Sequence, residues 1–163
     1  MIRYVGLLGL FAFSCSKQPS HWTIDQIDSG KTEFCFTKLC YSSSDPVNGI
    51  DIELSKKGDQ IQVYLLIHST PVAALKSDPQ SVAVSIRTSQ EKLSDTAYRF
   101  QGGQRFLLST ESSEKIIELL KSKQEITILL NGYRTVLKPE DFEQKYETFL
   151  HPLYLRNPFQ FSL

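Results

Sequence analysis

Alternation of apolar and polar residues is the feature of this chain that most constrains its fold. Residues 49–55 read Gly-Ile-Asp-Ile-Glu-Leu-Ser, and the alternation resumes over residues 61–68 after the turn sequence Lys-Lys-Gly-Asp at 56–59. A period of two places the apolar side chains on one face of a strand. These two segments therefore predict a hairpin with one buried face.

The same period recurs along the rest of the chain. Residues 81–87 form one alternating segment, and residues 97–100 and 105–108 flank a turn that contains Gly102-Gly103. Residues 126–130 and 133–137 are joined by Asn131-Gly132. Asn-Gly is a strong hairpin signal, because a type I′ turn needs positive φ at both central residues. The pattern predicts a series of short strands.

Two segments have helical periodicity instead. In residues 113–121 the apolar positions Ile116, Ile117, Leu119 and Leu120 form one stripe, and we expect Ile116, Leu119 and Leu120 to pack against a sheet. Residues 139–149 begin with a proline, which the first helical turn accepts, and place Phe142, Tyr146 and Phe149 on one face.

Together these segments predict a mainly β fold, an antiparallel β-sandwich or open barrel with two short helices. A parallel α/β fold is disfavoured, because helices do not alternate with strands. Residues 21–163 are expected to form a single β-rich domain, and 40% hydrophobic and 22% charged residues suit a globular body. The chain has 18 basic and 18 acidic residues, so no nucleic-acid partner is expected.

The first residues have the composition of an export signal. Arg3 precedes an apolar run from Tyr4 to Phe13, which is shorter than the roughly 20 residues of a membrane-spanning helix. A basic start, a short apolar run and small residues near a cut site are typical of a signal peptide. We therefore assign residues 1–14 as a signal peptide.

The cut site has two interpretations, and both imply export. The sequence Ala12-Phe13-Ser14-Cys15 resembles the lipobox of bacterial lipoproteins, which implies a diacylglycerol on Cys15 and a lipid-anchored tether over residues 15–20. With Ser16 after the cysteine, the sequence resembles Gram-negative lipoproteins that are sorted to the outer membrane. This resemblance implies a domain in the periplasm or at the cell surface. Ala12 and Ser14 also satisfy the small-x-small rule of ordinary signal peptidase.

The chain has three cysteines, Cys15, Cys35 and Cys40. An exported protein rarely keeps a free thiol, so lipid on Cys15 would leave Cys35 and Cys40 as a disulfide pair. We expect residues 31–36 and 39–43 to form a hairpin in which Cys35 and Cys40 face each other. A redox role is disfavoured because it usually uses Cys-x-x-Cys, and a metal site would need two further ligands.

The remaining motifs indicate no catalytic or cofactor site. The histidines His21, His68 and His151 are scattered along the chain, and Gly102-Gly103 lacks the Lys-Ser/Thr of a phosphate loop. No cofactor or metal is expected. The aromatic, proline-broken segment at 151–161 has two interpretations: a tail packed along the domain, or a segment that docks onto another protein by adding a strand.

Residues 104–150 are similar in their order of elements to small exported bacterial domains of the invasion-associated locus B type. The order is strand, short helix, hairpin, and a helix with the spacing Phe142-x-x-x-Tyr146. The resemblance implies a β-sandwich and transfers no functional residue.

The sequence favours a lipid-anchored, non-enzymatic envelope protein with a binding or assembly role. Its expected partners are membrane lipid through acylated Cys15 and an envelope or host protein. Two alternatives remain open: a periplasmic hydrolase-like enzyme whose site is assembled from scattered residues, or a purely structural envelope lipoprotein.

Overall fold

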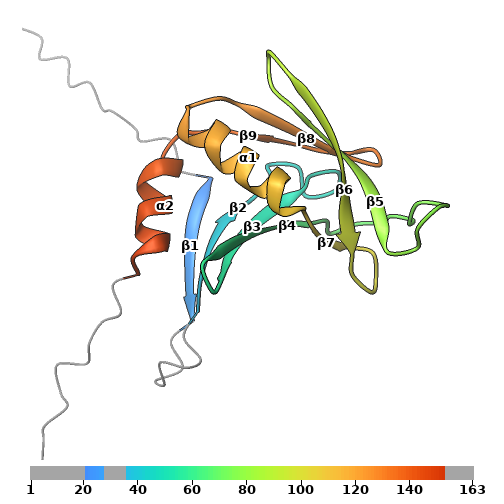
Figure 1. Ribbon diagram of the computed structural model, residues 1–163, viewed down its shortest axis with the longest axis horizontal. Helices are drawn as coiled ribbons and strands as arrows, with labels where there is room; N and C mark the ends of the chain where they lie inside the picture. Colours follow the sequence, from blue (N-terminus) through green and yellow to red (C-terminus); the bar gives the residue numbers. More distant parts are fainter. Residues whose placement is uncertain (1–20, 28–35, 153–163) are drawn as a thin grey trace, which may run out of the picture.

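The computed structural model describes residues 21–27 and 36–152 of the chain. Within these ranges it contains nine strands and two helices (Figure 1). In chain order they are β1 (Trp22–Ile27), β2 (Phe36–Tyr41), β3 (Asp51–Lys57), β4 (Gln60–Leu66), β5 (Ser81–Arg87), β6 (Lys92–Arg99), β7 (Arg105–Leu107), α1 (Thr110–Lys121), β8 (Ile126–Leu130), β9 (Tyr133–Leu137) and α2 (Phe142–Leu150).

The described strands form one antiparallel sheet in the order β1-β2-β3-β4-β7-β6-β5-β8-β9. The short strand β7 is inserted between β4 and β6, so the first and second halves of the chain share one sheet. The prediction of a mainly β, antiparallel fold with two short helices is confirmed. The sheet is continuous and curled, with β8 and β9 facing β3 and β4 across the interior (Figure 1).

Side chains connect the two ends of the curled sheet. The indole Nε1 of Trp22 on β1 donates a hydrogen bond to the carbonyl of Lys138, just after β9, at 2.8 Å. The Tyr41 hydroxyl on β2 donates to the carbonyl of Val136 on β9 at 2.7 Å. We call this junction of β1 and β2 with β9 the seam. Because β1 and β9 are not paired in the sheet, the barrel stays open.

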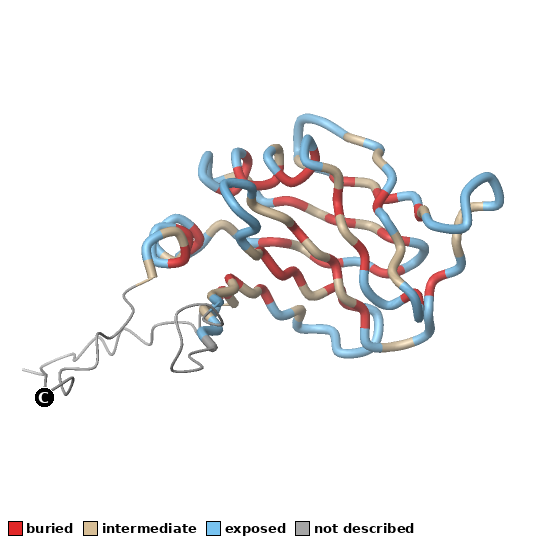
Figure 2. The backbone as a smooth tube through the Cα atoms, turned by 60° about the horizontal axis from the view of Figure 1, so that its bottom comes forward, coloured by how far each residue is buried: buried red, intermediate tan, exposed pale blue. Residues whose placement is uncertain are grey.

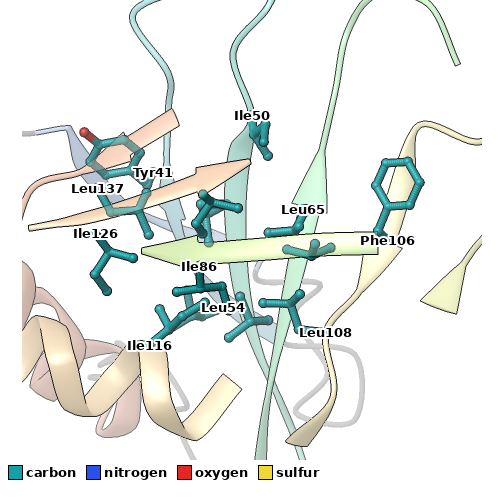
Figure 3. Packing of buried hydrophobic residues seen from close by; sticks show 14 of the residues in the cluster. Tyr41, Ile50, Leu54, Leu65, Ile86, Phe106, Leu108, Ile116, Ile126 and Leu137 are labelled. Atoms are coloured by element: carbon teal, nitrogen blue, oxygen red, sulfur yellow. The ribbon is translucent and has the colours of Figure 1, made fainter. Parts of the chain in front are cut away.

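The inner face of the sheet carries the hydrophobic core, as the alternation predicts (Figure 2). Leu54 on β3, Leu65 on β4 and Phe106 on β7 are fully buried, and Ile86 on β5 and Ile126 on β8 belong to the same cluster (Figure 3). Asn131 and Gly132 have φ angles of 45° and 91°, so the turn between β8 and β9 has the positive φ values expected from Asn-Gly.

Helix α1 lies in the curl and packs against β4 and β8. Its N-cap is Ser109, whose side chain accepts a hydrogen bond from the Ser112 amide. Ile116, Leu119 and Leu120 are buried, which confirms the packing face predicted for this helix. Helix α2 packs against β1 and β2 and buries Phe142, Tyr146 and Phe149, the three aromatic residues expected on its inner face.

One predicted hairpin is wrong. Residues 36–41 form the single extended strand β2, so residues 39–43 do not turn back on residues 31–36. Instead β2 pairs with β1 on one side and β3 on the other. The physical reason is that residues 36–41, Phe-Thr-Lys-Leu-Cys-Tyr, alternate between the two faces of a strand and contain no turn residue.

Candidate functional site

A group of charged and aromatic side chains lies on the outer face of the sheet, opposite the core. On β2, β3, β4 and β7 the buried residues alternate with outward-facing ones, so this face is set by the same period that builds the core. The strand register places one residue from each of six neighbouring strands in a continuous row: Thr23, Cys40, Glu53, Tyr64, Leu107 and Tyr98.

Glu53 is the centre of this group. Its residue is only 8% exposed although it faces away from the core. The Nζ of Lys38, on β2, lies 2.9 Å from one carboxylate oxygen, and Nη2 of Arg105, on β7, lies 2.8 Å from the other. A buried carboxylate is costly without such partners. Two cations therefore hold this one in a fixed orientation.

Aromatic rings surround Arg105. Its guanidinium carbon lies 4.2 Å from the centroid of the Tyr64 ring and 5.8 Å from that of Phe100. Both distances suit cation–π attraction. Tyr98 packs edge-on against Phe100, with ring centroids 5.0 Å apart, and Tyr98 is 44% exposed. We call the set Lys38, Glu53, Tyr64, Tyr98, Phe100 and Arg105 the outer patch.

Cys40 lies beside the outer patch, and its environment disfavours nucleophilic chemistry. The thiol donates to a carboxylate oxygen of Asp25 over 3.6 Å. Burial, reinforced by the charge and hydrogen bond of Asp25, raises the pKa of the Cys40 thiol to about 12. Since the thiolate is the reactive form, this cysteine is suited to a structural role.

The disulfide predicted between Cys35 and Cys40 stays a prediction. Cys40 has a free thiol in the structure, and Cys35 lies outside the described residues. The usual strand rise places the Cα atoms of Phe36 and Cys40 about 13 Å apart. One more residue shortens this by at most about 3.8 Å, whereas a disulfide needs Cα atoms within about 7 Å. The bond therefore requires the start of β2 to leave the sheet.

His68 acquires a carboxylate partner that the sequence did not indicate. Its Nε2 lies 2.9 Å from Oδ2 of Asp51, and the other Asp51 oxygen accepts a hydrogen bond from the Ser43 amide. A carboxylate that orients a histidine is part of the machinery of many hydrolases. The His68 side chain is 58% exposed and the Asp51 side chain 31%, so the histidine is open to solvent and the carboxylate is partly buried.

A second carboxylate, Asp95, lies at the start of α1. Its Oδ2 accepts hydrogen bonds of 2.6 Å from the hydroxyls of Ser109 and Ser112, and its Oδ1 accepts one from the Thr96 amide. Burial alone would raise the pKa of Asp95, but these hydrogen bonds outweigh it and hold the pKa below its usual range. The arrangement anchors a helix N-terminus, where negative charge is favourable.

The predicted anchor concerns residues outside the described ranges. The lipidation site Cys15 lies outside the described residues. No group of three or more potential metal ligands occurs within the ranges 21–27 and 36–152. In this part of the chain, neither helix is long and apolar enough to cross a membrane.

Comparisons of the chain with protein families, with characterised proteins and with solved structures found no match. A functional assignment therefore depends on the residues of this chain.

Sequence reasoning missed the outer patch. Glu53 and Arg105 are separated by 52 positions, and each alone is an ordinary outward-facing residue of a strand. The available signal was weak: Tyr98 and Phe100 flank Arg99 just before the glycine turn, with Arg105 just after it. This concentrates aromatic and basic residues at one hairpin.

Proposed function

We propose that this chain is an exported, lipid-anchored protein that acts by binding, with the outer patch as its contact surface. The observation that carries the proposal is the Glu53 carboxylate, held between Lys38 and Arg105, with Arg105 in turn packed against a partly exposed aromatic cluster. Tyrosine and arginine dominate the energetics of protein interfaces. Ion pairs and ring contacts fix these side chains in advance, so little rotamer entropy is lost on binding.

The anchor is the part of the proposal that depends on the N-terminal sequence. Mass spectrometry of the protein from native membranes is expected to find a mature N-terminus at Cys15 carrying acyl chains. Cys15→Ala is expected to move the protein to the soluble fraction, because a polar domain without acyl chains loses its hydrophobic anchor. An unmodified Cys15 thiol in the mature protein would refute the anchor.

Photocrosslinking in cells tests the contact surface. A photoreactive residue at Thr96, on the outer face two positions from Tyr98, is expected to yield a discrete adduct with an envelope or host protein. The same probe at Val47, which is 56% exposed in the loop before β3, is the control and is expected to yield none.

The change Tyr98→Ala tests whether the patch itself supplies the binding energy. An interface hot spot contributes about 2 kcal/mol or more, so the adduct formed from Thr96 is expected to fall by at least about tenfold. Equal adducts from Thr96 and Val47, or an adduct that Tyr98→Ala leaves unchanged, would contradict the proposal. An adduct with a single abundant envelope component would favour the purely structural lipoprotein.

The His68–Asp51 pair favours a second candidate, a hydrolase-like enzyme. The pair supplies a base and the carboxylate that orients it. If the chain hydrolyses activated esters, His68→Ala is expected to lower the rate constant by at least about a hundredfold. An equal rate in the wild type and in His68→Ala would mean that the His68–Asp51 pair has only a structural role, next to the start of β3 and the end of β4.

A further inference from the structure

A hollow of about 400 Å³ opens at the seam, between the start of β1, the loop after β2 and the free edge of β9. Its volume lies within the range of roughly 300–1,000 Å³ that is usual for small-molecule sites. We call it the seam hollow, and none of its lining residues belongs to the outer patch. It is lined mainly by His21, Ser44, Asp45, Arg134, Val136 and Lys138.

Two cations in the wall of the seam hollow have no counter-ion among the described residues. Arg134 is the one arginine in this part of the chain whose side chain makes neither a hydrogen bond nor an ion pair. The side chains of the other arginines each donate a hydrogen bond, namely Arg87, Arg99 and Arg105. Lys138 likewise has no described carboxylate within ion-pair distance. Unpaired cations that line one hollow attract an anion.

The open edge of β9 adds a backbone donor to the same wall. The register of β8 and β9 turns the N–H and C=O groups of Arg134 and Val136 away from β8. The Arg134 amide donates to the Asn48 carbonyl, and the Val136 carbonyl accepts from the Tyr41 hydroxyl. The Val136 N–H has no acceptor among the described residues. Backbone N–H groups that face a hollow are common partners of anionic oxygens.

Carboxylates are few around the seam hollow. Asp45 is the one acidic side chain among the described residues of its wall. Its Oδ1 accepts two backbone amides of its own loop, which hold the pKa of this carboxyl below its usual range. Burial, with smaller contributions from Glu140 and Glu125, raises the pKa of Tyr41, but neither glutamate lines the hollow. The wall therefore contains two cations against one carboxylate.

We propose that the seam hollow binds a phosphate monoester, with the phosphoryl oxygens held by Arg134, Lys138 and the Val136 N–H. A phosphoryl group offers three strong acceptor oxygens and pairs with arginine through two parallel hydrogen bonds. A carboxylate has only two oxygens and would leave part of this donor set unused. The His21 ring and the Ser44 hydroxyl supply further donors, and the remaining volume accommodates the organic part of the ester. This site goes beyond the proposed contact surface and does not depend on it.

Calorimetric titration of the purified mature chain with inorganic phosphate and with glycerol 3-phosphate tests the site. Saturable binding of one phosphoryl group per chain is expected, with the ester bound at least as tightly as the inorganic ion. Sodium chloride at equal ionic strength is the control, and it is expected to give no saturable heat. Absence of saturable binding with both phosphate probes would overturn the proposal.

The change Arg134→Gln is expected to weaken binding of both probes by at least about tenfold, because a hydrogen bond to a charged group is lost. Lys138→Gln is a second variant with the same expected direction. The matched control is Arg87→Gln, which removes an exposed arginine outside the seam hollow and is expected to leave the affinity unchanged. Equal weakening in Arg134→Gln and Arg87→Gln would indicate general charge attraction and would overturn the site.

The change Asp45→Asn tests the charge of the wall from the opposite side. Asparagine keeps an oxygen for the two loop amides and removes the negative charge, so binding of glycerol 3-phosphate is expected to tighten several-fold. Unchanged or weaker binding would place the phosphoryl group outside the seam hollow and contradict the assignment.

A water-soluble, short-chain phosphatidic acid separates the two sources of such an ester, because it presents the same phosphate monoester on a lipid. If it binds more tightly than glycerol 3-phosphate, and Arg134→Gln weakens that binding, the ligand is a lipid headgroup. Weaker binding than that of glycerol 3-phosphate assigns a soluble ester. Either result supports the site, whereas binding that Arg134→Gln leaves unchanged counts against it.

Discussion

At the scale of single residues, the outer patch depends on one carboxylate. Glu53 is nearly covered, whereas its partners Lys38 and Arg105 keep 28% and 44% of their side-chain surface. The two cations can therefore recover water if the carboxylate is lost. For this reason the cost of losing Glu53 is smaller than for an ion pair buried on both sides.

We expect Glu53→Ala to lower the free energy of unfolding by about 1–3 kcal/mol, because it leaves two cations side by side without their shared acceptor. Denaturant unfolding measures this change. The control is Glu118→Ala, whose carboxylate is exposed and 3.8 Å from Lys115, and it is expected to change stability by less than about 0.5 kcal/mol. Equal losses in the two variants would mean that the ion pairs of Glu53 stabilise the fold no more than an exposed surface pair.

Cys40 is expected to react slowly with alkylating reagents. With a pKa of about 12, its thiolate fraction at pH 8 is on the order of a thousandfold below that of an ordinary cysteine thiol. Iodoacetamide labelling followed by mass spectrometry measures the rate. Denaturant should restore rapid labelling if the thiol is free. If Cys40 is bonded to Cys35, labelling in denaturant will need a reductant.

At the scale of elements, α1 is held at both its start and its inner face. Ser109 and Ser112 join its first turn to Asp95 on β6, and Ile116 and Leu120 bury its inner side. The first contact depends on charge and therefore on pH. The second is apolar and does not.

The contribution of Asp95 is expected to disappear in acid. Hydrogen bonds hold its pKa below the unfolded value of about 3.9. A carboxyl whose folded pKa is lowered stabilises the protein above the unfolded pKa, and this contribution is lost as pH falls through the folded pKa. Asp95→Asn should therefore cost stability at pH 7, and this cost should shrink as pH falls below the unfolded pKa. Thermal unfolding across this range measures the difference, and a constant difference would contradict the assignment.

Leu120→Ala is expected to lower the free energy of unfolding by about 2–5 kcal/mol, because Leu120 is 1% exposed and its removal leaves a cavity beneath α1. Glu114→Ala, on the exposed side of the same helix, is the matched control and should be nearly neutral. An unchanged melting temperature together with lost partner binding would instead make α1 an interface.

At the scale of the whole molecule, the curled sheet is joined by side chains at the seam and not by a strand ladder. The Tyr41 hydroxyl, attached to a residue that is 3% exposed, reaches the Val136 carbonyl on β9. Trp22 makes the neighbouring contact to Lys138. Each bond joins segments about a hundred residues apart, so the seam keeps the first strands against the last.

Tyr41→Phe is expected to lower stability at neutral pH by about 0.5–1.5 kcal/mol and to speed amide hydrogen exchange in β9. This loss of stability should become smaller in alkali. Burial raises the pKa of Tyr41, so its stabilising effect is complete below the unfolded pKa of about 10 and is lost as pH rises through the folded pKa. Unfolding measured at pH 7 and above pH 10 checks both parts, with Tyr98→Phe as an exposed control.

Local patterns in the sequence determined the elements and the face that each buries. Period-two alternation predicts the hairpin of β3 and β4, Asn131-Gly132 predicts the turn before β9, and the apolar stripe predicts the inner face of α1. These predictions succeed because strand period, turn conformation and helix period depend on residues a few positions apart. The exception is β2, where the spacing of two cysteines predicts a loop but residues 36–41 alternate and form a strand.

The tertiary structure alone decided which strands became neighbours, and through them the candidate site. Insertion of β7 between β4 and β6 brings Arg105 to Glu53 across 52 positions, and the curl of the sheet brings Tyr41 to Val136 across 95. Alternation fixes the face of a side chain but says nothing about the strand beside it, because pairing depends on packing of the whole sheet. The outer patch and the seam are both products of that pairing.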